Sequence, residues 1–125
     1  MSGSRSHRKG KQWERECARE LSAALGVSVQ RRLDETREGN AGDLLIPGVP
    51  LVVQCKVGKR PPIYKALAQA QEVAGEEDVP AAMIRRNGSG RRPSEDFVVL
   101  PLEDFLKIAE KIWSTVGISP PDPEF

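Results

Sequence analysis

Two short apolar runs joined by a turn decide the fold of this chain: Asp43-Leu44-Leu45-Ile46, the turn Pro47-Gly48, and Leu51-Val52-Val53-Gln54-Cys55-Lys56-Val57. Runs of this length, rich in Val, Leu and Ile and separated by Pro-Gly, predict a β-hairpin. Residues two apart on a strand share a face, so Gln54 and Lys56 should lie on one face of the second strand. Its other face then carries Val53, Cys55 and Val57 toward a core. The hairpin would bring Asp43 beside the two polar residues.

The elements around the hairpin follow from periodicity. Apolar residues recur at helical spacing in residues 12–25, 63–74 and 102–116. Strands are expected at 27–33, 80–85 and 97–100, and strand 80–85 should run parallel to 51–57 after a helical crossover. The order α-β-β-β-α-β-β-α predicts an α/β fold, a mixed sheet flanked by helices. We expect the core to contain Trp13, Trp113 and the phenylalanines.

The 125 residues are enough for one domain. We expect a flexible basic N-terminus at 1–8, a single domain at 9–116 and a Pro-rich tail at 117–125. Neither Cys17 nor Cys55 has a Cys or His at metal-ligand spacing, so both are expected to be buried thiols in a reducing compartment. No apolar run approaches the ~20 residues of a membrane span, and no signal peptide is visible. These features predict a cytoplasmic protein without membrane contact.

Positive charge is concentrated in the first half of the chain. The net charge is only +1, but residues 1–60 hold 12 Lys and Arg against 7 Asp and Glu, whereas residues 61–125 hold 7 against 11. A basic segment beside a polar hairpin suits phosphate attraction. The alternative is ordinary solvated surface charge. The candidate DNA-binding residues are Arg8, Lys9, Lys11, Arg31, Arg32, Lys59 and Arg60; Arg85, Arg86, Arg91 and Arg92 flank a Gly-rich loop that could also contact DNA.

The hairpin and the first helix offer ligands for a hard divalent cation. Asp43 and Glu14 supply carboxylates, and Gln54 supplies a neutral carbonyl oxygen; we also expect the backbone carbonyl of Cys55 to be a ligand. Oxygen ligands of this kind suit Mg²⁺ or Mn²⁺. Lys56 could orient an attacking water or stabilise charge on a phosphorane. The predicted catalytic residues are therefore Glu14, Asp43, Gln54 and Lys56.

Each of these residues also has an ordinary interpretation. An Asp after Gly is most often a turn residue, and a Lys on a strand is often an edge charge. Glu14 competes with Glu16 and Glu20, and any of the three could be a solvent-facing helix charge. Glu14 lies next to Trp13 on the helical wheel, at the border of the apolar stripe, which favours it over Glu16.

In the order of its helices and strands and the motif residues on them, the chain resembles the PD-(D/E)xK nuclease superfamily. It has an Asp on the second strand and Gln54-x-Lys56 on the third. Within it, Arg8-Lys9-Gly10, followed by Glu14 four residues after the Gly, looks like the start of archaeal and phage Holliday junction resolvases. The resemblance implies a restriction-endonuclease-like core and a homodimer that resolves four-way junctions in DNA recombination. It also implies Mg²⁺-dependent hydrolysis that leaves a 5′-phosphate, and a supporting Gln (Gln69 or Gln71) on the following helix.

Gln54 departs from the resolvases, which usually have Glu at this position. Gln-x-Lys is instead characteristic of restriction nucleases that cleave modified DNA, so a nuclease acting on duplex DNA is an alternative. Because one carboxylate is missing, a DNA-binding module that has lost catalysis is a second alternative. A structural or interaction protein with an acidic C-terminal half is a third.

Overall fold

The computed structural model describes residues 2–31, 43–46 and 49–116, and for residues 2–7, 30, 31, 43 and 45 it describes the backbone only. The predicted turn 47–48, the predicted loop 34–42 and the predicted tail 117–125 lie outside the described residues. The elements are α1 (Ser2–Leu25), β1 (Gln30–Arg31), β2 (Asp43–Leu45), β3 (Leu51–Gly58), α2 (Ile63–Val73), β4 (Val79–Arg86), β5 (Glu95–Val99) and α3 (Leu102–Val116). The α/β class and the three helices are confirmed.

The sheet is mixed, with the order β1-β2-β3-β4-β5. Strands β3 and β4 are parallel, as the helical crossover through α2 predicts, and the other neighbours are antiparallel. Three strands of five residues or more, β3, β4 and β5, form the body of the sheet. On one side, the described parts of β1 and β2 add two and three residues, and residues 32 and 33 of the predicted strand 27–33 lie outside the described residues.

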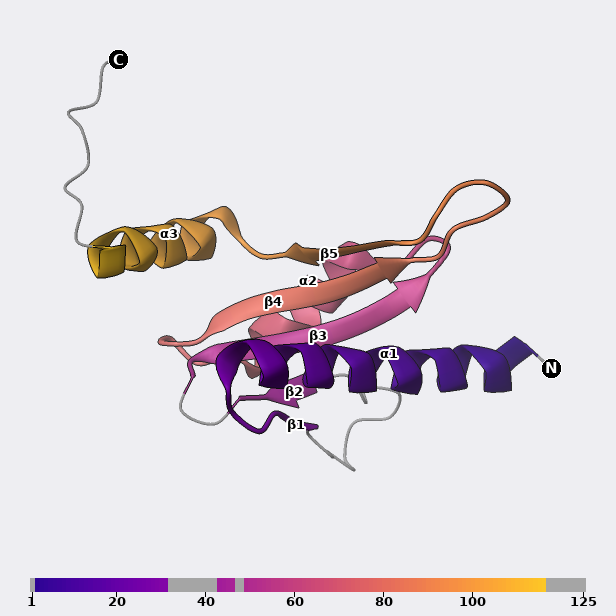
Figure 1. The fold of residues 1–125 in the computed structure, drawn as a ribbon, viewed down its shortest axis with the longest axis horizontal. Coiled ribbons are helices and arrows are strands. Elements are labelled where there is room, and N and C mark those ends of the chain that lie inside the picture. Colours follow the sequence, from indigo (N-terminus) through magenta and orange to yellow (C-terminus); the bar gives the residue numbers. More distant parts are fainter. Residues whose placement is uncertain (1, 32–42, 47–48, 117–125) are drawn as a thin grey trace, which may run out of the picture.

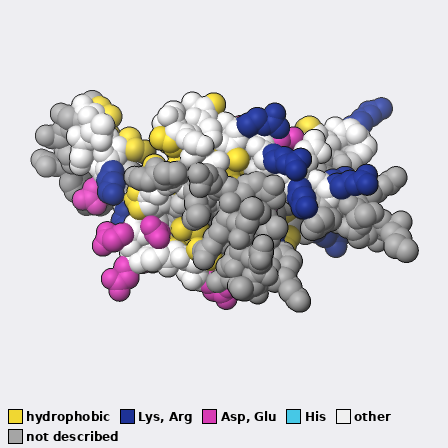
Figure 2. Space-filling view, turned by 90° about the horizontal axis from the view of Figure 1, so that it is seen from below, with side chains coloured by type: hydrophobic (Ala, Val, Ile, Leu, Met, Phe, Trp, Pro, Cys, Tyr) yellow, Lys and Arg dark blue, Asp and Glu magenta, His cyan; other side chains and the backbone are white. Residues whose placement is uncertain are grey.

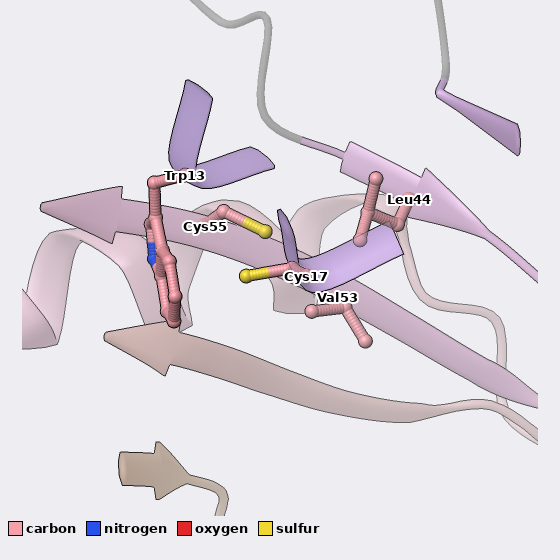
Figure 3. Close-up of a cluster of buried hydrophobic side chains, with 5 residues drawn as sticks. All are labelled: Trp13, Cys17, Leu44, Val53 and Cys55. Carbon is pink, nitrogen blue, oxygen red and sulfur yellow. The ribbon is translucent and has the colours of Figure 1, made fainter. Parts of the chain in front are cut away.

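Helices cover the two faces of β3 and β4. Figure 1 shows α1 across one face of the sheet and α2 behind the other. Under α1 lies a core cluster of five buried residues, drawn in Figure 3: Trp13, Cys17, Leu44, Val53 and Cys55. Val57 packs against this cluster, which confirms the predicted inward face of β3. Under α2 the core is built by Ala66, Ala82 and Ile84. Small residues on both elements let α2 approach the sheet closely.

Helix α1 is longer than its apolar pattern predicts. It begins at Ser2 and runs through the segment 1–8 that the sequence predicts to be flexible. The apolar stripe starts only at Trp13: of the residues before it whose side chains are described, 8, 9, 11 and 12 are exposed and Gly10 is half-buried. The helix ends where Gly26 takes a left-handed φ of 69° and donates its N–H to the carbonyl of Ser22. The chain then continues without strand structure to Val29, so the predicted strand start at Val27 is wrong.

Helix α3 lies beyond the end of the sheet and covers neither face of it (Figure 1). Only Asp104 among its residues is buried. Phe105 is 51% exposed and Trp113 is 40% exposed, so the prediction that these two aromatic residues belong to the core is wrong. Trp13, by contrast, is 2% exposed, as predicted.

The α1 cluster should dominate the stability of the fold. Leu44 is fully buried, whereas Leu25 at the end of α1 is 45% exposed. We expect Leu44→Ala to lower the free energy of unfolding by about 2–5 kcal/mol, because it removes buried methyl groups and leaves a cavity. The matched Leu25→Ala should change it by about 0.5 kcal/mol or less. Urea denaturation of both variants measures this, and equal losses would contradict the placement of the core.

Candidate metal and nucleic-acid site

The hairpin register brings the predicted hairpin residues together. Asp43 in β2 lies directly opposite Gln54 in β3, and Lys56 follows two residues further along β3. In an antiparallel pair, opposite positions share a face of the sheet. Gln54 is also paired with Ala82 of β4, part of the core under α2, so its side chain lies on the α2 side of the sheet. Lys56 is half-buried.

Gln54 is the most unusual residue of the sheet. Its side chain is fully buried, yet neither Oε1 nor Nε2 has a hydrogen-bond partner within the described part of the chain. A buried amide without partners costs about 1–3 kcal/mol, and an apolar residue of the same size would avoid that cost. The unpartnered Oε1, beside the position of Asp43, fits a bound cation, which would supply a partner for this oxygen but not for the donor Nε2.

The described part of β2 pairs with β3 as far as Asp43 and Gln54. Residues 32–42, which precede Asp43, lie outside the described residues. On the other side of β3, Cys55 to Gly58 pair with β4. Cys55, a predicted metal ligand through its backbone carbonyl, is the next residue of β3 after Gln54.

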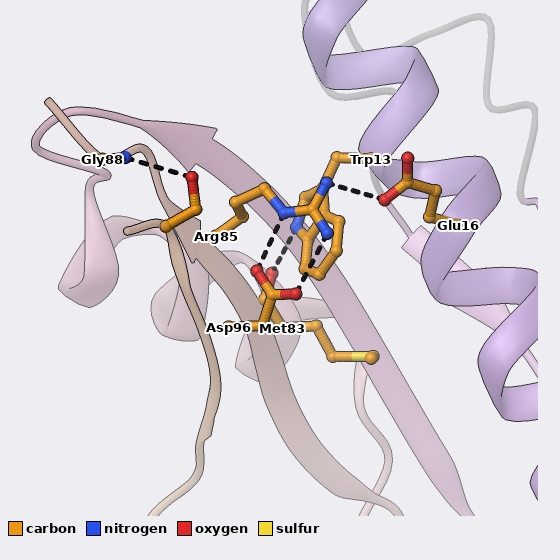
Figure 4. A network of polar contacts seen from close by, with 7 residues as sticks. Trp13, Glu16, Met83, Arg85, Gly88 and Asp96 are labelled. Carbon is orange, nitrogen blue, oxygen red and sulfur yellow. Dashed lines mark hydrogen bonds and ion pairs between the residues drawn. The ribbon is translucent and has the colours of Figure 1, made fainter. Parts of the chain in front are cut away.

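The structure distinguishes Glu14 from the other acids of α1. Glu14 is 3% exposed and has an interaction partner, whereas Glu20 is exposed. Glu16 is directed toward β4, since its Oε2 accepts a hydrogen bond of 2.7 Å from Arg85 (Figure 4). At 100° per residue, Glu14 lies on the flank of Trp13 opposite to Glu16. That flank faces away from β4 and toward the β2 side of β3.

Arg85 fixes α1 to the sheet. Its guanidinium lies 4.2 Å from the centre of the Trp13 ring, and it forms a two-pronged ion pair with Asp96 of β5 at 2.8 and 3.0 Å. The Trp13 indole N–H donates to the carbonyl of Met83 at 3.0 Å. These contacts, drawn in Figure 4, hold the first helix so that Glu14 keeps its place. Hydrogen bonding from Arg85 lowers the pKa of Asp96, and the pKa of Arg85 is raised in return.

Gln54 and Glu14 alone do not make a site for a hard cation; the predicted ligand set also needs Asp43. No three His, Cys, Asp or Glu side chains lie together among those described, and the Asp43 side chain is not one of them. Asp43 and Gln54 share one face of the hairpin, whereas Glu14 comes from the α1 side. The arrangement therefore offers an amide oxygen at Gln54, the position of Asp43 opposite it, and the buried carboxylate of Glu14 on α1.

The basic residues lie at the end of the molecule where β3 ends. Trp13 of α1 packs near Cys55 and Cys17 packs near Val53, so α1 runs antiparallel to β3. Residues 8–11 of α1 thus lie at the carboxyl end of β3, where Lys59 and Arg60 follow. Figure 2 shows most Lys and Arg side chains toward the end where α1 begins, and most Asp and Glu side chains toward the other end. Such a gradient attracts phosphates to one end.

The predicted DNA contacts divide into two groups. Exposed at the basic end are Arg8, Lys9, Lys11, Lys59 and Arg60. Arg32 lies outside the described residues, and only the backbone of Arg31, in β1, is described. Arg85 and Arg86 are engaged with acids, since Arg86 pairs with Glu95 at 2.8 Å, whereas Arg91 and Arg92 are exposed.

Two exposed residues at this end were missed by sequence reasoning. Arg15 continues a row with Arg8 and Lys11 on α1, and the spacing of three and four residues would have revealed it. Tyr64 is 88% exposed at the start of α2, next to Arg60 and Lys65, and its aromatic ring could stack on a base. Of the two glutamines of α2, Gln69 is half-buried and Gln71 is exposed, so only Gln69 lies toward the sheet.

Comparisons with family models, curated proteins and solved structures found no match to this chain. No helix in the part of the chain that the structure describes is long and apolar enough to cross a membrane.

Replacing the buried amide tests whether Gln54 is retained for binding. We expect Gln54→Met to raise the free energy of unfolding of the metal-free protein by about 1–3 kcal/mol, because it removes a buried polar group without partners. The same variant should lose stabilisation by Mn²⁺, measured as the rise in Tm with metal. Gln71→Met, at an exposed position of α2, should change neither quantity. A destabilised Gln54→Met would mean that the amide is hydrogen-bonded in solution.

The Arg85–Asp96 pair predicts a pH dependence. Because the pKa of Asp96 is lowered in the folded protein, its contribution is present above the unfolded carboxyl value of about 4 and is lost as pH falls through the folded value. Asp96 is partly exposed, so the contribution should not exceed about 1 kcal/mol. The difference in unfolding free energy between wild type and Asp96→Asn should therefore shrink from pH 7 to pH 3. Glu77→Gln, an exposed control, should show no such change.

Proposed function

We propose that this protein is a metal-dependent DNA endonuclease with a restriction-endonuclease-like core, acting on four-way junctions. The observation that carries the proposal is Gln54, a fully buried amide without a hydrogen-bond partner among the described residues, in register with Asp43. A structural role would favour an apolar residue there, whereas a cation site requires the oxygen. The Lys and Arg side chains gathered near the carboxyl end of β3 support a polyanionic substrate.

The residues have distinct roles in this proposal. Glu14, Asp43, the amide oxygen of Gln54 and the backbone carbonyl of Cys55 would hold Mg²⁺ or Mn²⁺. The bound metal supplies Lewis acidity toward the phosphate and lowers the pKa of water. Lys56 donates hydrogen bonds to the attacking water or to the phosphate oxygens. Water attacks phosphorus in line as the bond to the 3′ oxygen breaks, which leaves a 5′-phosphate.

The basic end positions the substrate. Exposed Lys and Arg side chains of α1 and of the segment after β3 contact the DNA backbone, so they read shape and not sequence. A domain of this size, without an added recognition element, is suited to branched DNA. Binding should therefore weaken steeply with salt.

A nuclease acting on linear duplex and a DNA-binding module without catalysis are the two alternatives. The observation that favours them is again Gln54, whose amide is neutral where resolvases usually have a Glu. The site therefore carries one negative charge fewer, which weakens its affinity for a divalent cation. The three candidates differ in what they do to a junction, so one experiment separates them.

The test is cleavage of an end-labelled four-way junction with matched linear duplex as competitor, in Mg²⁺ and in Mn²⁺. Wild type should make paired symmetric nicks. Asp43→Asn and Glu14→Gln should each reduce the rate by on the order of 10²–10³, as expected for loss of a positioned charge at the reacting phosphate. Glu20→Gln, on the exposed side of the same helix, should cut at the wild-type rate.

The outcomes are distinct. Preferred cleavage of linear duplex selects the duplex nuclease. Junction binding without cutting in either metal selects the binding module. Equal loss in Glu14→Gln and Glu20→Gln would remove Glu14 from the site, and the absence of any DNA affinity at low salt would overturn the proposal.

A further inference from the structure

Helix α3 carries an apolar stripe whose large side chains are exposed in the part of the chain that the structure describes. The stripe consists of seven residues on one side of the helix: Leu102, Phe105, Leu106, Ala109, Ile112, Trp113 and Val116. Six of them are large, and each of the six is between 40% and 71% exposed, whereas the small Ala109 between them is half-buried. The side that approaches the body is a different one, since Asp104 is buried and Ile108 is half-buried. Both lie opposite Leu106 and Trp113 on the helical wheel.

A helix with this pattern requires a partner. An isolated helix of about 12–15 residues is marginal in water, and most helix stability in proteins comes from packing of an apolar face. The stripe repeats at spacings of three and four residues over two heptads, which is the pattern of helix-to-helix packing. Monomeric proteins rarely leave contiguous apolar patches beyond a few hundred Å² exposed.

The stripe is symmetric about its centre. Ala109 lies midway between Phe105 and Trp113, between Leu106 and Ile112, and between Leu102 and Val116. An antiparallel copy of the same helix, crossing at Ala109, would therefore place each aromatic residue opposite an aromatic residue. The aliphatic residues would face aliphatic residues, and the small side chain of Ala109 would allow the two backbones to approach closely. Such self-complementarity is what a two-fold interface requires.

We propose that α3 is a dimerisation surface and that its partner is α3 of a second copy of this chain, antiparallel across a two-fold axis at Ala109. Large side chains offer on the order of 150–250 Å² each, so six that are about half exposed contribute roughly 500–700 Å² per copy. Two copies then bury about 1,000–1,400 Å², near the lower bound for specific stable interfaces. Aromatic residues at the centre of the patch match the composition of interface cores.

Sedimentation velocity of the full chain over a wide concentration range tests the proposal. The 13.7 kDa chain should sediment as a dimer that dissociates on dilution. Ala109→Glu should weaken dimerisation by about 30-fold or more, because it places two charges at the centre of the interface. Glu110→Gln, on the exposed flank, should leave it unchanged. Because α3 packs little on the body, circular dichroism and thermal unfolding should show that Ala109→Glu keeps its fold.

A cross-linking experiment tests the antiparallel geometry. Ala109→Cys should form an intermolecular disulfide under mild oxidation, since the proposed axis brings the two positions within the Cα separation that a disulfide spans. Lys111→Cys, exposed on the side of α3 opposite to the stripe, should not. The native Cys17 and Cys55 are buried and provide no competing thiol.

Three results would overturn the proposal. The chain could remain monomeric at every concentration, as expected if residues 117–125 cover α3; deletion of 117–125 would then alter the exposure of Trp113. The dimer could survive Ala109→Glu unchanged, which would place its interface elsewhere. Cross-linking could be equal at 109 and 111. None of these results depends on nuclease activity. Failure of the dimer can therefore be distinguished from failure of the proposed function.

Discussion

Strand β3 is covered on both faces, and the candidate site follows from that constraint. Helix α1 packs its core against Val53 and Cys55, and α2 covers the face that carries Gln54. Every inner position of β3 is therefore withdrawn from water, and any polar side chain there must find a partner or lower stability. Gln54 has no hydrogen-bond partner within the described residues, so it lowers stability. Packing therefore does not explain why the fold keeps this amide at its centre.

The hairpin and the helical crossover could be predicted from the sequence because their signals are local. Alternation and a Pro-Gly turn define β2 and β3, and the helix between β3 and β4 forces a parallel pairing. The position of α3 could not be predicted in this way. Its amphipathic pattern shows that one face is apolar, but not which surface covers that face. The same pattern that buries Trp13 leaves Trp113 exposed.

The candidate site was predictable in its strand residues and less so in its helix residue. Spacing alone places Gln54 and Lys56 on one face. The helical wheel favours Glu14 over Glu16 because Glu14 lies at the border of the apolar stripe, and Glu14 is buried in the structure. The partner of Glu16 could not be predicted, since its hydrogen bond from Arg85 joins residues 69 positions apart in the chain. No local pattern encodes such a contact, because Arg85 is one of several arginines beside a loop.

The two proposals place different demands on the same molecule. Positive charge gathers at the end where α1 begins, whereas α3 lies beyond the opposite end of the sheet (Figures 1 and 2). A two-fold axis through α3 therefore points the two basic ends away from each other. Each copy would then engage its own DNA segment, and the separation of the two cuts would be set by the dimer and not by the branch point. Paired symmetric nicks close to a branch point would require a different angle between α3 and the sheet. The short connection between β5 and α3, Leu100 and Pro101, determines that angle.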